Sequence, residues 1–188
     1  MLLLNKITTS SWQVKPRPSV QSLPARKSAK STALKGYFWL GLLLLAAFAL
    51  QEFGRWQWPW LAERQAGDVY KQLSGFALVG YLAHQWRCSR LRNRGLMQKA
   101  ARLLHQHKLL GALAPGFFYA HAQHLGYAYL LALSLAYFAI FITGLCNVEI
   151  TGLRKPWFRK LWITVHVGLA TGLLVLLGYH VFISYAYQ

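Results

Sequence analysis

Long apolar runs alternate with short polar segments along most of this chain. The first run, Gly36 to Glu52, reads GYFWLGLLLLAAFALQE, and the last covers Leu161 to Tyr185. Between them lie a shorter run at Leu73 to Trp86 and a long block from His107 to Cys146. A membrane-spanning helix needs about 20 residues, so the long block holds two helices, and we place their break near Gly126. The pattern predicts an all-α integral membrane bundle of about five transmembrane helices.

Basic residues are distributed very unevenly between these helices. Eighteen Lys and Arg lie before the first helix, between the second and third (counting Lys108 just inside the third), and between the fourth and fifth. The remaining connections hold only Arg55, Arg64 and Lys71. With five helices, the three rich segments share one side of the membrane, which the positive-inside rule assigns to the cytoplasm. We therefore expect the N-terminus inside and the C-terminus outside.

The composition is typical of a membrane protein. The 188 residues are 55% hydrophobic and 13% charged, with 21 Lys and Arg against 4 Asp and Glu, whereas about 25% of residues in soluble domains are charged. In a soluble protein this excess of positive charge would indicate nucleic acid, which we do not expect here. Topology signals alone would produce it, and the alternative is a role in binding anionic lipid or an acidic partner. We predict a multi-pass protein of the bacterial inner (plasma) membrane.

The chain divides into a basic N-terminal tail, residues 1–35, and a helical bundle, residues 36–188. The tail is rich in Ser, Lys and Arg and has no acidic residue, which is typical of a disordered or transit-like segment. Packing on a partner subunit would order it. Nucleotide-binding and zinc motifs such as GxGxxG, the Walker loop, CxxC and HExxH are absent.

Four of the seven histidines are in phase on two predicted helices. His107 and His121 are 14 residues apart on the third helix, and so are His166 and His180 on the fifth. Fourteen residues fall about 40° short of four turns, so each pair lies on one helix face, with its members about 21 Å apart along the axis. Because the two helices run in the same direction, His107 and His166 share the inner level, and His121 and His180 share the outer level.

Two levels with one histidine from each helix are what bis-histidine ligation of two haems requires. The iron lies between imidazoles on facing helices, and the porphyrin lies in the apolar core. The alternatives are a single haem, or histidines that only form hydrogen bonds between helices. Zinc or copper is disfavoured, because these ions need ligands clustered at one level, usually with Cys or carboxylate.

The other three histidines do not match this spacing. His105 is about 160° out of phase with His121, and His124 is about 100° out of phase with His107. We expect His105 to be a propionate contact or a surface residue, and His124 is a candidate contact of an outer propionate. His84 is a spare ligand, a proton-carrying group or, as we favour, a helix contact.

Small residues and one proline support this interpretation. Gly111 lies one turn after His107, and Gly178 lies just before His180, so a flat macrocycle can approach both helices closely. Pro115 is expected to kink the third helix and to free a backbone carbonyl between the two levels. Basic residues that can neutralise inner propionates are Arg102, Lys108 and Lys160.

The segments HKLLGALAPGFFYAH (His107 to His121) and HVGLATGLLVLLGYH (His166 to His180) resemble the ferric reductase-like transmembrane domain. That superfamily includes ferric reductases, NADPH oxidases and the haem-bearing membrane partner of the periplasmic methionine sulfoxide reductase. The resemblance covers roughly Leu73 to Tyr185. It implies two b-type haems stacked across the membrane, electron transfer from the inside to the outside, and axial ligation of iron by His107, His121, His166 and His180.

The chain departs from that family in two respects. The family usually has six helices, whereas this chain is expected to end after the fifth. Many members carry a flavin and nicotinamide domain after the sixth helix, and we expect none here and no direct oxidation of NAD(P)H.

The expected function is transmembrane electron transfer, as a cytochrome b subunit or partner of an oxidoreductase complex. Redox proteins on one or both sides, or a quinone, would be its partners. The alternative function is a non-catalytic anchor or assembly subunit whose histidines bind pigment or only pack. A metal or proton transporter is disfavoured, because no helix-centre carboxylate accompanies the histidines.

Overall fold

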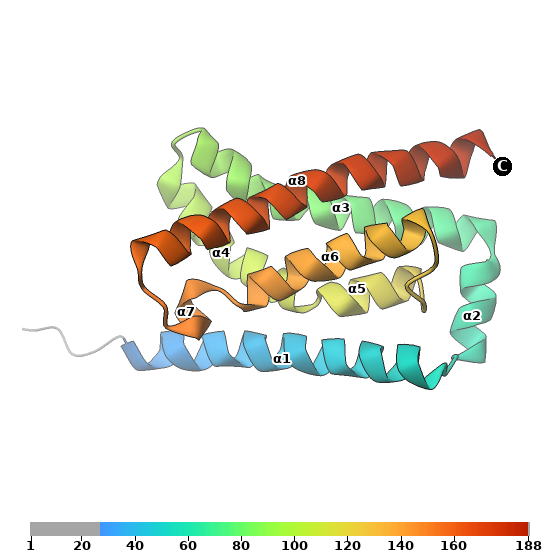
Figure 1. The fold of residues 1–188 in the computed structure, drawn as a ribbon, viewed down its shortest axis with the longest axis horizontal. Helices are drawn as coiled ribbons and strands as arrows, with labels where there is room; N and C mark the ends of the chain where they lie inside the picture. Colours follow the sequence, from blue (N-terminus) through green and yellow to red (C-terminus); the bar gives the residue numbers. More distant parts are fainter. Residues whose placement is uncertain (1–26, 188) are drawn as a thin grey trace, which may run out of the picture.

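A computed structural model describes residues 27–187, and every regular element in that range is helical. Most of these helices run roughly side by side along the long axis, while α2 crosses one end (Figure 1). The predicted all-α class is therefore confirmed for the described residues. The helices are α1 (Lys27–Gly54), α2 (Pro59–Ala66), α3 (Asp68–Asn93), α4 (Met97–Ala112), α5 (Ala114–His121), α6 (Tyr129–Leu145), α7 (Val148–Thr151) and α8 (Pro156–Ala186).

Five long helical segments correspond to the five predicted helices, with α4 and α5 together forming the third. The first helix begins at Lys27, ahead of the predicted boundary at Gly36, so the end of the basic tail belongs to α1. Residues 1–26, the rest of that tail, lie outside the described part. The predicted break near Gly126 is confirmed, because this residue lies in the α5–α6 loop with a φ of +78°.

Two of the described helical segments are long and apolar enough to cross a membrane, Gly36–Gly54 of α1 and all of α8. The α6 helix is also apolar, but it has only 17 residues. The structure thus supports a membrane protein with two candidate spans. The topology of about five spans remains a prediction.

Pro115 interrupts the third segment, as predicted. The α4 helix ends at Ala112 and α5 begins at Ala114, because proline has no N–H to donate and its ring collides with the preceding turn. The Tyr137 hydroxyl donates a hydrogen bond of 2.9 Å to the Ala114 carbonyl, and the Tyr81 hydroxyl donates one of 3.2 Å to the Leu110 carbonyl. Two tyrosines from neighbouring helices therefore supply partners for carbonyls beside the break.

The core is an aromatic cluster where α1, α5 and α6 meet. Phe48 of α1 lies with its ring centroid 5.4 Å from that of Phe118 and 4.8 Å from that of Phe138. Such aromatic pairs contribute about 0.5–1.5 kcal/mol each beyond the area they bury. By contrast, α8 has only one buried residue, Leu173. This helix packs mainly against α6. Its contacts with α3, α4 and α5 are few.

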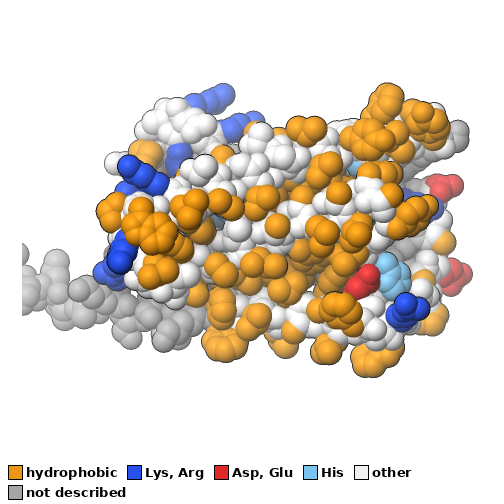
Figure 2. Space-filling view, viewed as in Figure 1, with side chains coloured by type: hydrophobic (Ala, Val, Ile, Leu, Met, Phe, Trp, Pro, Cys, Tyr) orange, Lys and Arg blue, Asp and Glu red, His pale blue; other side chains and the backbone are white. Residues whose placement is uncertain are grey.

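Charged side chains separate between the two ends of the bundle (Figure 2). We call the end formed by the C-terminus of α3, the start of α4 and the α7–α8 connection the basic end; Glu149 is its one acidic residue. The other end, which we call the opposite end, contains three basic and three acidic residues, all between Glu52 and Lys71. The basic end carries Arg87, Arg90, Arg92, Arg94, Lys99, Arg102, Lys108, Arg154, Lys155, Arg159 and Lys160.

Candidate functional site

The structure brings the four in-phase histidines together as two pairs. The ring centroids of His107 on α4 and His166 on α8 are 6.3 Å apart, and those of His121 on α5 and His180 on α8 are 6.5 Å apart. The two rings of each pair are nearly perpendicular, at 83° and 82°. Each pair joins the α4–α5 segment to α8, which is the pairing that the sequence predicts.

The ring separation suits two imidazoles bound to one metal ion from opposite sides. A metal–imidazole bond is about 2 Å long, and the ring centre lies about 1.2 Å behind the bonded nitrogen by standard covalent geometry. Two such rings therefore have centroids about 6.4 Å apart. Directly packed aromatic rings span about 4.5–7 Å, so distance alone does not separate the two cases. Packing does not, however, require that two pairs repeat one geometry within 0.2 Å and 1°.

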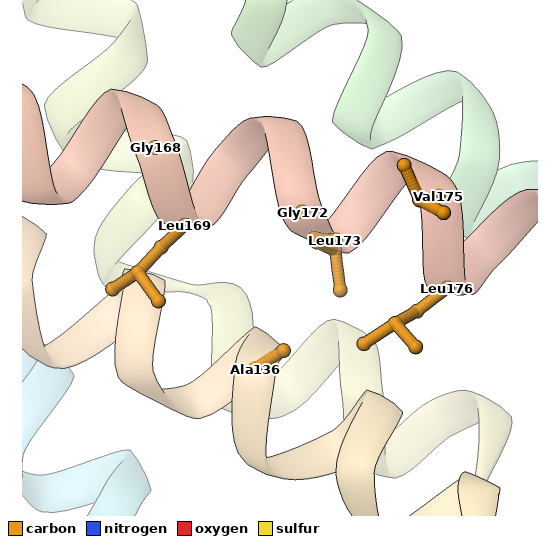
Figure 3. Close-up of a pocket in the computed structure, with 7 residues that line it drawn as sticks. All are labelled: Ala136, Gly168, Leu169, Gly172, Leu173, Val175 and Leu176. Atoms are coloured by element: carbon orange, nitrogen blue, oxygen red, sulfur yellow. The ribbon is translucent and has the colours of Figure 1, made fainter.

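Open space lies along α8 between its two histidines. A groove of about 530 Å³ is lined by Ala136 of α6 and by α8 residues from Gly168 to Leu176. Figure 3 shows the leucine side chains of this stretch projecting toward α6, while Val175 points away. A second hollow of about 280 Å³ lies between α3 and α8, lined by residues that include Val79 and Leu177.

Several glycines near the histidines also face open space. A Cβ built on Gly80, Gly111, Gly168, Gly172 or Gly178 would meet no heavy atom within 4 Å. These positions leave room for a flat, apolar group beside α8. None of the four histidines lines either hollow. The fit to two haems therefore rests on the ring separation of the pairs and on the glycines.

One histidine of each pair contacts a hydroxyl residue followed by glycine on a neighbouring helix. At the basic level this dipeptide is Thr143–Gly144 of α6, whose hydroxyl oxygen lies 2.8 Å from Nδ1 of His166. At the opposite level it is Ser74–Gly75 of α3, whose hydroxyl oxygen lies 3.0 Å from Nδ1 of His121. A Cβ on the glycine would lie 3.5 Å and 3.4 Å, respectively, from Cε1 of the same ring. We call these dipeptides the threonine clamp and the serine clamp; the sequence pattern did not predict them.

The second histidine of each pair has no such contact. Nδ1 of His107 and Nδ1 of His180 are buried, and neither makes a hydrogen bond within residues 27–187. Each pair therefore combines one clamped ring with one ring that is held by packing.

Trp162 adds a further contact at the basic level. Its ring stacks on that of His166, with centroids 5.5 Å apart and an interplanar angle of 10°, and its indole N–H donates to the carbonyl of Thr143 at 2.7 Å. Trp157, near the start of the same helix, is exposed instead.

Two of the remaining histidines bond to protein groups. His105 is exposed, with its Nε2 2.6 Å from the Tyr37 hydroxyl. His124 lies in the α5–α6 loop, with its Nδ1 2.9 Å from a carboxylate oxygen of Glu52. Its Nε2 lies 3.2 Å from Nε2 of Gln57.

Lys108, one of the three basic residues proposed as propionate contacts, forms an ion pair with Glu149 at the basic end. His84 is half-buried, and its Nδ1 has no hydrogen-bond partner in the described part of the chain.

A cluster of three or more His, Cys, Asp or Glu side chains suited to a metal ion does not occur within residues 27–187. The histidine pairs are thus the candidate metal centres of the described chain, because bis-histidine haem ligation takes only two side chains for each iron. Comparisons with protein-family models, curated proteins and solved structures found no match to this chain.

Proposed function

We propose that this chain is a dihaem membrane cytochrome b that transfers electrons across a membrane. The observation that carries the proposal is the repeated histidine pair, with ring centroids 6.3 and 6.5 Å apart on helices with a 14-residue spacing. His107 and His166 would hold one haem b at the basic level, and His121 and His180 would hold the second at the opposite level. When bound, haem supplies the one-electron chemistry that the side chains lack.

The protein's own groups would bind, orient and insulate. With one imidazole from each helix of a pair holding the haem, its chemistry would be electron transfer rather than binding of oxygen or substrate. The apolar groove along α8, which Gly168 and Gly172 help to line, would offer an apolar surface beside this helix. The two levels lie about 21 Å apart along the helices, so the pairs span a large part of an apolar layer of about 30 Å.

Five spanning segments complete the proposal: α1, α3, the α4–α5 segment, α6 and α8. Basic residues at the C-terminus of α3 and at the start of α4 lower the mean hydropathy of these two helices. These basic parts would extend beyond the hydrocarbon into the lipid headgroup region. The basic end would face the cytoplasm by the positive-inside rule and bind anionic lipid. The N-terminus would then be inside and the C-terminus outside, in a bacterial inner membrane.

The partners follow from the proposed chemistry. Electrons would enter and leave through redox proteins on either side, through a larger membrane complex or through a quinone. Membership of the ferric reductase-like superfamily is part of the proposal and rests on the histidine segments of α4–α5 and α8. The alternative, a non-catalytic anchor or assembly subunit, would use the same rings only for packing or pigment binding.

A visible spectrum with a pyridine haemochrome assay on the protein purified in detergent tests the proposal. We expect b-type bands on reduction and about two haems per chain, released by acid acetone because the sequence has no CxxCH attachment motif. The matched control is His105→Ala, which removes a histidine outside the pairs and should keep both haems. A chain without haem bands, or with chlorin bands, would support the anchor or pigment-binding alternative.

A further inference from the structure

The hydroxyl of each clamp has a single proton, and a carbonyl of its own helix lies within hydrogen-bond distance to accept it. Thr143 Oγ1 donates to the carbonyl of Ile140 at 2.8 Å, and Ser74 Oγ donates to the carbonyl of Lys71 at 3.2 Å. In both cases the acceptor lies three residues earlier in the same helix. Because a hydroxyl donates only one hydrogen bond, its oxygen can then only accept from the imidazole.

With the hydroxyl proton on the helix carbonyl, the imidazole is the donor. In that arrangement Nδ1 of His166 and Nδ1 of His121 carry the proton that faces the clamp. A neutral imidazole has one N–H, so Nε2 of these rings keeps its lone pair, and this is the form that binds a metal. The opposite tautomer would place a proton on the nitrogen that coordinates iron.

We propose that the two clamps are positioning devices that fix the tautomer and rotation of one axial histidine at each level, so that its Nε2 faces the haem iron. This inference rests on the proposed dihaem function and deepens it. Partners of this kind orient metal-ligating histidines and raise their basicity, and their loss lowers metal affinity about 10- to 100-fold. Thr143 and Ser74 act through the histidines and touch no haem themselves.

The glycine of each clamp allows the helix backbone to lie against the ring. A Cβ at 3.4–3.5 Å from the imidazole would make an ordinary van der Waals contact, so alanine fits at Gly144 and Gly75. Any larger side chain would extend into the ring and turn it away from its partner. The hydroxyl thus sets the direction of the ring, and the glycine sets its distance from the helix.

The histidine that is clamped lies on a different helix in each pair. The clamped ring belongs to α8 at the basic level and to α5 at the opposite level, and the unclamped rings are those of His107 and His180. One ring fixed by a hydrogen bond would be enough to orient the site, and the second ring of the pair would supply the other ligand. Loss of a clamp should therefore affect its own level and leave the other unchanged.

The chain provides a matched control in Thr171–Gly172 of α8. Thr171 is exposed, and its hydroxyl donates to the Val167 carbonyl at 3.0 Å, as a clamp hydroxyl donates within its own helix. Within the described residues, Thr171 makes no hydrogen bond to a histidine. A Thr171→Val variant therefore removes the same chemical group from the same kind of helix position without touching a proposed ligand.

The first measurement is made on haem-free protein. In the ¹⁵N-histidine NMR spectrum, His166 and His121 should show a protonated Nδ1 and an unprotonated Nε2. Thr143→Val should abolish this preference for His166 alone, Thr143→Ser should keep it, and Thr171→Val should change nothing. A spectrum in which Nε2 of both rings carries the proton would overturn the inference, whether or not the protein binds haem.

The second measurement is a redox titration of the haem-loaded protein. Loss of the hydrogen bond makes the imidazole a weaker donor to ferric iron, so Thr143→Val should raise the midpoint potential of one haem and weaken retention of that haem about tenfold. Ser74→Ala should do the same to the other haem, and it supplies the test if Thr143→Val does not accumulate. Equal potentials in the wild type and both clamp variants would contradict the inference. Absence of haem from the wild type would contradict the proposed function instead, and the NMR result would still stand.

Discussion

The two histidine levels have the same parts but different surroundings. At the basic level, the ring of His166 is clamped from α6 and stacked against Trp162, which also bonds to the carbonyl of the clamp residue Thr143. At the opposite level, the ring of His121 is clamped from α3, and its partner His180 lies beside Tyr129, with centroids 6.2 Å apart. The first level is reinforced within the helices, whereas the second lies near the connecting loops.

This difference shows that a clamp is a local contact, which does not depend on one particular helix. A hydroxyl residue followed by glycine can hold an imidazole wherever a neighbouring helix presents the two residues to the ring. What varies is the support behind the clamp. We therefore expect the basic-level haem to be held more tightly, because its clamped ring is fixed by a hydrogen bond at one edge and by an indole against its face.

Removal of a ligand should separate the two levels most strongly. If each pair holds one haem, replacing His107 or His166 with alanine would remove one ligand of the basic-level site, so both variants should lose the same haem and retain the other. Replacing His121 or His180 should give the complementary spectrum. The measurement is haem stoichiometry with a redox titration, and variants of one pair that leave different surviving components would break the comparison.

Loss of Trp162 should weaken only the basic level. Trp162→Leu removes an aromatic contact of about 0.5–1.5 kcal/mol and a hydrogen bond of about 1 kcal/mol. Since about 1.4 kcal/mol corresponds to a factor of ten, we expect the basic-level haem to be transferred to apomyoglobin roughly tenfold faster. Trp157→Leu, an exposed tryptophan on the same helix, is the control. An equal effect on both haems would show that Trp162 stabilises the bundle in general.

The opposite level should depend on a polar node between the α1–α2 and α5–α6 loops. The buried Gln51 amide donates to the carbonyls of Trp56 and Gln123, at 2.7 and 3.2 Å, and the Gln123 side chain accepts from the backbone N–H of Trp58 at 3.1 Å. Gln123→Ala leaves that N–H without its partner, at a cost of about 1–3 kcal/mol.

The Gln123→Ala change should lower the thermal midpoint of the purified protein and loosen the opposite-level haem before the basic-level one. Gln57→Ala, in the α1–α2 loop and exposed, is the control and should have a smaller effect on both. A uniform loss of both haems in Gln123→Ala would show that this node stabilises the whole bundle and not the opposite level in particular.

The helices and the histidine pairs could be predicted because their signals are local. Apolar runs mark the buried lengths of helices, and a 14-residue spacing fixes the phase of two side chains whatever surrounds them. The limits of the helices were harder to predict, because α1 continues to Lys27 and α3 to Asn93, through charged residues that hydropathy excludes. The short α2 was also missed, although Pro59 at its first position is a typical start signal.

The clamps could not be predicted, because their residues are common and their role arises only from packing. The chain contains four Ser/Thr–Gly dipeptides, at residues 74, 143, 151 and 171. Thr151–Gly152 ends α7, where the glycine has a φ of +70°, and Thr171–Gly172 lies on the poorly buried α8. Only the other two face a histidine ring, and no periodicity in the sequence distinguishes them.

Two double variants with the same number of lost histidines test the central claim most directly. His107→Ala with His166→Ala removes one complete pair, whereas His107→Ala with His180→Ala removes one ligand from each pair. If the pairs are the haem sites, the first variant should retain about one haem per chain, with an unchanged potential for that component, and the second should retain none. Equal haem content in the two variants would contradict the account.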